Sequence, residues 1–150
     1  MRRTASLLLA PVLMAAGCVT PQQGAPLQLP YLAMFKPPPP GKETILLTAA
    51  GTQYLRIDNH CVLMGNPQAG YSLPIFYPRT TVGRDGRGLY VQDAQNGRKF
   101  RNGDKVKIGG GSSPFKGRDL DQWLVRPIPD VCLARTGGSA ASVNPGMKRA

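Results

Sequence analysis

The sequence of 150 residues is poor in the side chains on which most enzymes and metal sites depend. It contains one histidine, His60, one glutamate, Glu43, and three cysteines. A structural zinc site takes four nitrogen or sulfur ligands, and this set does not supply them convincingly. A Ser/His/Asp or Cys/His nucleophile would have to use His60, the only imidazole. We therefore expect no catalytic residue, no metal and no cofactor, with a hydrolase working through His60 as the disfavoured alternative.

Long apolar runs are also missing. The apolar stretch from Ala5 to Ala16 has twelve residues, whereas a helix that spans a bilayer needs about 20. Arg2 and Arg3 precede this stretch and small residues follow it, which is the arrangement of an export signal. A buried core helix is the alternative, and the flanking arginines and the proline-rich segment behind it argue against that.

The end of this segment, Leu13-Met14-Ala15-Ala16-Gly17-Cys18, resembles the lipobox of bacterial lipoproteins. The resemblance implies that residues 1–17 are a signal peptide, and that Cys18 is lipidated and becomes the first residue of the mature chain. It further implies a location in the cell envelope, where two or more acyl chains give stable membrane attachment.

Two details bear on this expectation. Ala15 stands where the lipobox prefers leucine, and Ala15-Ala16-Gly17 also fits the small-x-small site of the ordinary signal peptidase. Cleavage without lipidation of Cys18 is therefore the alternative. Val19, rather than aspartate, follows the cysteine, which is compatible with outer-membrane sorting if the cell is Gram-negative.

Glycine and proline are abundant, with 18 and 15 residues, and they interrupt the chain too often for long helices. The length allows one modest domain. Residues 18–42, with the run Pro37–Pro40, are expected to form an extended tether; a docking segment for an aromatic groove is the alternative. Apolar residues between positions 27 and 35 are unusual for a pure linker, so part of this segment is expected on the domain or the membrane surface. Residues 136–150 are small and polar, so we expect a disordered tail. The folded domain is then expected over residues 43–135.

Within residues 43–135, short alternating segments are separated by turn signals about every 8–12 residues, a pattern typical of all-β sandwiches and barrels. The strongest turn signal is Asn96-Gly97. We expect a small antiparallel barrel or sandwich, similar to OB-type barrels, with about six or seven short strands. The local expectations are a first strand at 44–47, a strand at 71–77 that Pro74 and Pro78 place at a sheet edge or a bulge, a loop at 109–113, a short helix near 119–126, and a last strand at 131–133.

Two cysteines remain if Cys18 carries lipid. In an exported protein such a pair, Cys61 and Cys132, is expected to form a disulfide. The alternative is two buried free thiols. A bond across a loop of this length would stabilise the fold by about 4 kcal/mol in the chain-entropy model.

Acidic residues are scarce, since 8 Asp and Glu stand against 19 Lys and Arg, a formal net charge of +11. Seven basic residues are concentrated between positions 84 and 107, among aromatic residues and on predicted strands. They are the candidate anion- or partner-binding residues: Arg84, Arg87, Arg98, Lys99, Arg101, Lys105 and Lys107. Such residues can form charge-assisted contacts with an anion, or they can simply be a solvated strand face that discourages edge pairing.

Together these features predict a membrane-anchored bacterial envelope lipoprotein that acts as a non-catalytic binding or assembly module. Its expected partners are the membrane, through the acyl chains, and an anionic envelope polymer or envelope protein. Export makes nucleic acid an unexpected partner. The alternative function is that of a structural accessory subunit, which would bind through apolar residues such as Tyr71, Ile75 and Trp123.

Overall fold

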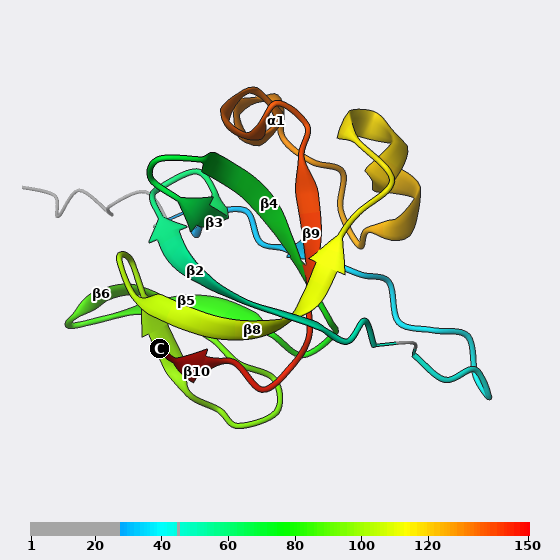
Figure 1. Cartoon of the computed structure of the whole chain (residues 1–150), viewed down its shortest axis with the longest axis horizontal. Coiled ribbons are helices and arrows are strands. Elements are labelled where there is room, and N and C mark those ends of the chain that lie inside the picture. The colour runs from blue at the N-terminus through cyan, green and yellow to red at the C-terminus, as the bar shows by residue number, and fades with distance from the viewer. Residues whose placement is uncertain (1–27, 45) are drawn as a thin grey trace, which may run out of the picture.

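The computed structural model describes residues 28–44 and 46–150 (Figure 1). The expected signal peptide, Cys18 and the first part of the tether lie outside the described residues. Short strands dominate this part of the chain. Its elements are β1 (Ala33–Met34), β2 (Ala49–Ile57), β3 (Val62–Asn66), β4 (Gly70–Phe76), β5 (Thr81–Asp85), β6 (Gly88–Gln92), β7 (Lys99–Arg101), β8 (Lys105–Ser112), the 3-10 helix η1 (Gly117–Trp123), α1 (Asp130–Thr136), β9 (Ala140–Val143) and β10 (Lys148–Arg149).

Five of these strands close into a barrel. β2, β3 and β4 form an antiparallel meander, and β8 pairs with β2 on the other side. β9 lies between β4 and β8, parallel to the first and antiparallel to the second, and so completes the ring. The prediction of a small all-β barrel is therefore confirmed. β1 and β10 extend it, as partners of β4 and β8.

The remaining strands, β5, β6 and β7, form a separate antiparallel sheet between β4 and β8 in the chain. Its side chains alternate. Val91 and Phe100 are fully buried and belong to the same core cluster as the barrel interior, with Val82 and Leu89 packed against it. The opposite face carries Tyr90 and polar residues. This sheet thus covers the barrel with one face and presents the other to solvent.

The barrel strands are buried on both faces over part of their length, and this gives two core clusters. The inner cluster takes residues from all five barrel strands, among them Leu55, Val62 and Val106. The outer cluster lies under η1 and α1 and includes Leu63, which alternates with Val62 along β3. Burial on both faces explains why β3 is a continuous apolar run rather than an alternating one.

The predicted disulfide is confirmed: Cys61 and Cys132 are bonded, with Cα atoms 5.9 Å apart. Both residues are fully buried in the outer cluster. The element that carries Cys132 was predicted wrongly, because residues 131–133 lie in α1 rather than in a strand. The helix starts after Pro129 and ends at Gly137, whose φ of 56° is the left-handed conformation of a helix C-cap. The predicted short helix near 119–126 is observed as η1.

The expected disordered tail over residues 136–150 is wrong. β9 is one of the strands that form the barrel wall, and β10 pairs with β8. Val143 and Met147 are each 1% exposed. The segment looked too polar to fold alone, but the neighbouring strands supply the apolar surface and hydrogen-bond partners that it lacks by itself.

The expected boundary between tether and folded domain, at residue 42, is also wrong, because the last part of the expected tether belongs to the folded body. Tyr31, Leu32 and Ala33 are buried, and β1 pairs with β4. The backbone N–H of Tyr31 donates to the carbonyl of His60 at 2.7 Å. The folded body therefore extends from about Pro30 to the last residue of the chain, and not over 43–135.

Three local predictions were wrong for related reasons. The described residues of 44–47 form no strand. β4 is not an edge strand, because it pairs with β9 on one side and with β3 and β1 on the other. Pro74 is accommodated because it lies where the partner on the second side changes from β3 to β1. Residues 109–111 belong to β8, where the backbones of β8 and β9 cross closely. A Cβ atom on Gly110 would lie 1.9 Å from the carbonyl oxygen of Ser142, so glycine is required there.

Candidate functional site

The seven predicted basic residues do not form one patch. Lys99 and Arg101 lie on the solvent face of the β5–β6–β7 sheet, and both contact Asp85. Arg101 Nη2 is 2.9 Å and Lys99 Nζ is 3.2 Å from Asp85 Oδ2. Tyr90 lies beside them, with Lys99 Nζ 4.1 Å from its ring centroid. These two cations therefore already have an acidic partner.

The charges in this cluster stabilise one another. Hydrogen bonds from the Arg101 side chain, the Arg87 backbone N–H and Lys99 hold the pKa of Asp85 well below its usual range. The same contact with Asp85 raises the pKa of Arg101. Tyr90 can lie flat here because Gly83 faces it, and a Cβ atom at that position would be 2.6 Å from the tyrosine hydroxyl. The cluster is a built structural feature rather than a free cationic surface.

Arg84, Arg87 and Arg98 are exposed at the ends of this sheet and do not converge. Arg84 Nη2 is 3.4 Å from Asn59 Oδ1 of the β2–β3 turn. Arg87 lies in the β5–β6 turn and Arg98 in the β6–β7 turn. Their positions agree with a solvated rim.

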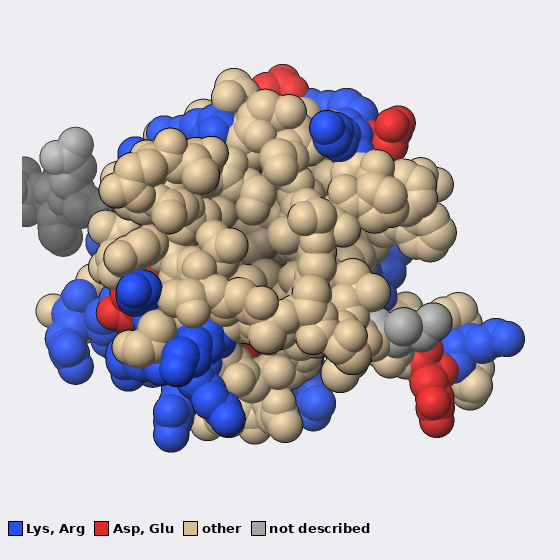
Figure 2. All heavy atoms as spheres, viewed as in Figure 1, with Lys and Arg blue, Asp and Glu red and all other residues tan. Residues whose placement is uncertain are grey.

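A second basic surface lies on the outer face of β2, β8 and β10, and we call it the lysine face (Lys105, Lys107 and Lys148). Lys107 stands directly opposite Lys148 in the β8–β10 register and opposite Thr52 in the β2–β8 register. Lys105 lies one pleat further along β8, with its Nζ 5.7 Å from the Tyr54 ring centroid. All three lysines are exposed, and none forms an ion pair within the described residues. Figure 2 shows Lys and Arg side chains gathered over this end of the molecule, with few acids among them.

A shallow groove of about 390 Å³ runs along the lysine face. It is lined by small residues, including Gly51 and Thr52, together with Lys107 and Lys148. Arg149, next to Lys148, points elsewhere and bonds Asp104 at 3.2 Å. Sequence reasoning found Lys105 and Lys107 but missed Lys148. A two-residue strand carries no periodic signal, so nothing in the sequence showed that the end of the chain returns beside β8.

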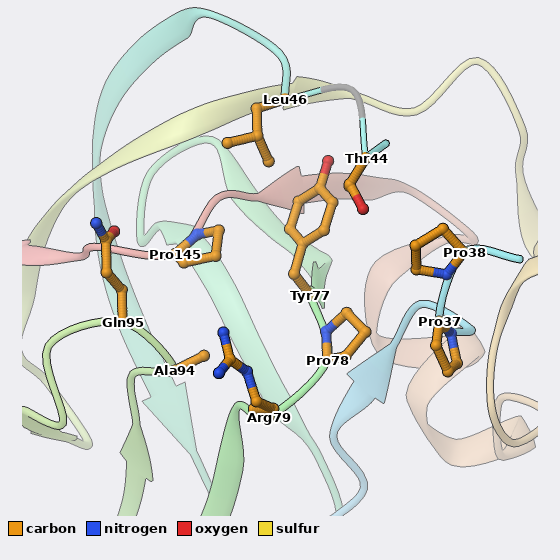
Figure 3. Close-up of a pocket in the computed structure, with 10 residues that line it drawn as sticks. All are labelled: Pro37, Pro38, Thr44, Leu46, Tyr77, Pro78, Arg79, Ala94, Gln95 and Pro145. Atoms are coloured by element: carbon orange, nitrogen blue, oxygen red, sulfur yellow. The ribbon is translucent and has the colours of Figure 1, made fainter. Parts of the chain in front are cut away.

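A separate cavity of about 620 Å³ lies on another part of the barrel (Figure 3). Four prolines line it: Pro37, Pro38, Pro78 and Pro145. Arg79 is its one charged lining residue, and Figure 3 shows this side chain reaching into the cavity between Pro78 and Ala94. Residues 36–44 and 46–48 leave the barrel here and contribute one wall. The expected spacer prolines therefore take part in a surface feature of the folded body.

The alternative apolar contact surface is not formed as predicted. Ile75 is fully buried in the outer core cluster and Tyr71 packs against the same cluster. Trp123 is exposed, at 49%, and lies near Phe115, with ring centroids 5.9 Å apart. Trp123 is thus the one exposed residue of the predicted set, Tyr71 is half-buried and Ile75 is buried.

His60 lies in the turn between β2 and β3 and is exposed. Its sequence neighbour Cys61 is held in the disulfide and is not available as a thiol. Among the described residues, no group of three His, Cys, Asp or Glu side chains is placed to hold a metal ion. Within the same part of the chain, no helix is both long enough and apolar enough to cross a bilayer.

Compared with known proteins, the chain matches no family model, no curated protein and no solved structure at a significant level.

Proposed function

We propose that the protein is a lipid-anchored, non-catalytic binding module of the bacterial cell envelope, whose lysine face binds an anionic envelope polymer or the acidic surface of an envelope protein. The anchor rests on the lipobox-like segment that ends at Cys18. The binding role rests on one structural observation, the direct opposition of Lys107 and Lys148 without an acidic partner in the part of the chain that the structure describes.

Like charges placed directly opposite each other on neighbouring strands destabilise a sheet. Some basic side chains elsewhere on this protein have acidic partners, as Arg101 has Asp85 and Arg149 has Asp104, whereas Lys107 and Lys148 have none among the described residues. An anion bound between Lys107 and Lys148 would remove their repulsion and form charge-assisted contacts with both. The small residues that line the groove would let a bulky anionic group approach the sheet.

The proposed binding surface differs from the predicted basic patch in its residues. Lys99 and Arg101 are already paired with Asp85 on the solvent face of the β5–β6–β7 sheet, so they contribute to stability more than to binding. Lys105 and Lys107 stay in the candidate site, and Lys148 joins them.

The test of the lysine face is a charge reversal. The double variant Lys107→Glu/Lys148→Glu should lower retention of the protein on an envelope fraction by about tenfold or more, the equivalent of about 1.4 kcal/mol or more. The matched control is Lys42→Glu/Lys116→Glu, which changes the net charge equally at exposed positions elsewhere. Retention of the unaltered protein should also fall as salt is raised. Equal retention of both double variants would reject the lysine face.

The anchor is tested separately. The intact mass of the mature protein should correspond to a chain that starts at Cys18 and carries acyl groups. The variant Cys18→Ser should leave the membrane fraction. Detection of an unmodified chain cleaved at the ordinary signal-peptidase site would contradict the lipid anchor and show export without lipidation.

A further inference from the structure

The strongest unexplained feature of the molecule is the backbone at Arg79. Its φ is 77°, and it is the only non-glycine residue of the described part of the chain with positive φ. It occupies the third position of the turn Tyr77-Pro78-Arg79-Thr80, which the Thr80 N–H closes on the Tyr77 carbonyl at 3.4 Å. Proline at the second position and positive φ at the third are the features of a type II turn, where glycine is strongly preferred at the third position.

An arginine at a glycine position carries a conformational cost, and residues held in such conformations are concentrated at functional sites. The side chain that this turn holds is the one charged group of the cavity in Figure 3. Arg79 forms no ion pair within the described residues, and no acidic side chain lines the cavity. Its guanidinium is thus presented to a space lined by four prolines together with uncharged residues such as Leu46 and Tyr77.

This cavity is one end of a longer groove. A second cavity, of about 460 Å³, shares Pro38, Tyr77 and Pro78 with the first. A third, of about 220 Å³, shares Phe35, Leu47 and Trp123 with the second and adds Phe115.

The groove therefore runs from Arg79 to Trp123 between the barrel and residues 36–44 and 46–48, and its walls are mainly proline, leucine and aromatic side chains. Two charged residues line the middle cavity. The Lys36 Nζ donates a hydrogen bond to the Gln122 carbonyl at 2.8 Å, and Glu43 is exposed.

We propose that this groove binds a long-chain fatty acid, with the carboxylate on Arg79 and the acyl chain along the apolar walls toward Trp123. One guanidinium at one end matches one monoanionic head group, and a carboxylate can accept two parallel hydrogen bonds from it. An acyl chain has no polar groups that need partners. A bound extended peptide would bring an N–H and a carbonyl with every residue, and the proline rings have no N–H to offer its carbonyls.

The single tryptophan of the chain supplies the readout, because Trp123 lies at the far end of the groove. The full chain carrying Cys18→Ser is titrated with brominated stearic acid below its micelle concentration. Saturable quenching of Trp123 fluorescence is expected. Arg79→Gln should weaken binding of the acid by about tenfold and leave binding of the corresponding brominated alcohol unchanged. The matched control Arg84→Gln should bind the acid normally.

A second variant separates binding from folding. Arg79→Gly fits the turn better, so its Tm should equal or exceed that of the unaltered protein while binding of the acid is lost. The Lys107→Glu/Lys148→Glu variant should bind the acid normally, since the lysine face is a different surface, and the two proposals can thus fail independently.

Several results would overturn the inference: no saturable quenching, equal affinity of Arg79→Gln for the acid, tighter binding of an alkyl phosphate than of the carboxylate, or displacement of the acid by a proline-rich peptide at lower concentration than by unbrominated stearate.

Discussion

The backbone N–H of Met147 donates a hydrogen bond to Oδ2 of Asp93, at 3.0 Å, and so ties the end of the chain to the turn after β6. Asp93 is 3% exposed, and its carboxylate also accepts hydrogen bonds from the backbone N–H groups of Gln95, Asn96 and Gly146. The buried charge has no cationic partner among its bonded atoms. Four N–H groups stabilise it instead, and they come from two segments about 50 residues apart.

The first prediction follows from this carboxylate. Asp93→Ala leaves several N–H groups without an acceptor, so it should lower the free energy of unfolding by about 3 kcal/mol and Tm by about 10 °C. Urea unfolding followed by circular dichroism measures the first quantity. Asp119→Ala, at an exposed position, should change stability by less than about 0.5 kcal/mol. A similar loss in both variants would contradict the assigned role of Asp93.

The second prediction concerns the last eleven residues. A chain that ends at Ser139 lacks β9, which leaves β4 and β8 unpaired on one side and exposes the barrel interior that Val143 and Met147 cover. It should show no cooperative unfolding transition. A chain that ends at Met147 lacks only β10 and should keep a cooperative transition at lower Tm. If the shorter chain unfolded cooperatively near the Tm of the full chain, these residues would be dispensable.

The third prediction concerns the disulfide. Cys61 and Cys132 are separated by 71 residues, and a bond across such a loop stabilises a fold by about 4 kcal/mol in the chain-entropy model. A thiol reductant should therefore lower the urea midpoint markedly. The double variant Cys61→Ala/Cys132→Ala should have a low midpoint that the reductant does not change. A reductant effect in the double variant would assign the loss to another cause.

The fourth prediction is the pH dependence due to Asp85. Its folded pKa lies below its unfolded pKa, chiefly because of the hydrogen bond from Arg101. The Asp85 contacts therefore stabilise the protein fully above the unfolded pKa, about 4, and this stabilisation is lost as pH falls below that value. Asp85→Asn should have a lower Tm near neutral pH and a smaller fall in Tm from pH 4 to pH 2. Because the site is partly exposed, 1 M salt should reduce the difference.

The strands that sequence reasoning located are those whose signal is local. Leu55 and Ile57 alternate with polar residues, and both point into the barrel. Asn96-Gly97 forms the turn between β6 and β7, with Gly97 at a φ of 67°. The cysteine pair was found because an exported chain with two remaining cysteines favours a disulfide. In each case the information lies within a few residues or in the composition.

The features that were missed depend on distant neighbours. β9 is four residues long, and only its position between β4 and β8 makes it a strand. Lys148 joins the lysine face through the same return of the chain. Residue Arg79 shows a different difficulty: the preceding proline indicates a turn, but an arginine gives no local sign of the positive φ that glycine would give.

The place of β9 also sets the order in which the protein can be completed. A chain that emerges from its N-terminus, on the ribosome or through a membrane pore, presents β2, β3, β4 and β8 before β9, the strand that pairs with β4 and β8 and closes the ring. The β4–β9 pairing links residues almost seventy positions apart, from Leu73 with Ala140 to Phe76 with Val143. Until residues 140–150 are free, the barrel stays open with two unpaired strand edges, which are sites for wrong association. A fused partner or tag that holds back the C-terminus would prolong this open period, whereas an attachment at the N-terminus would not.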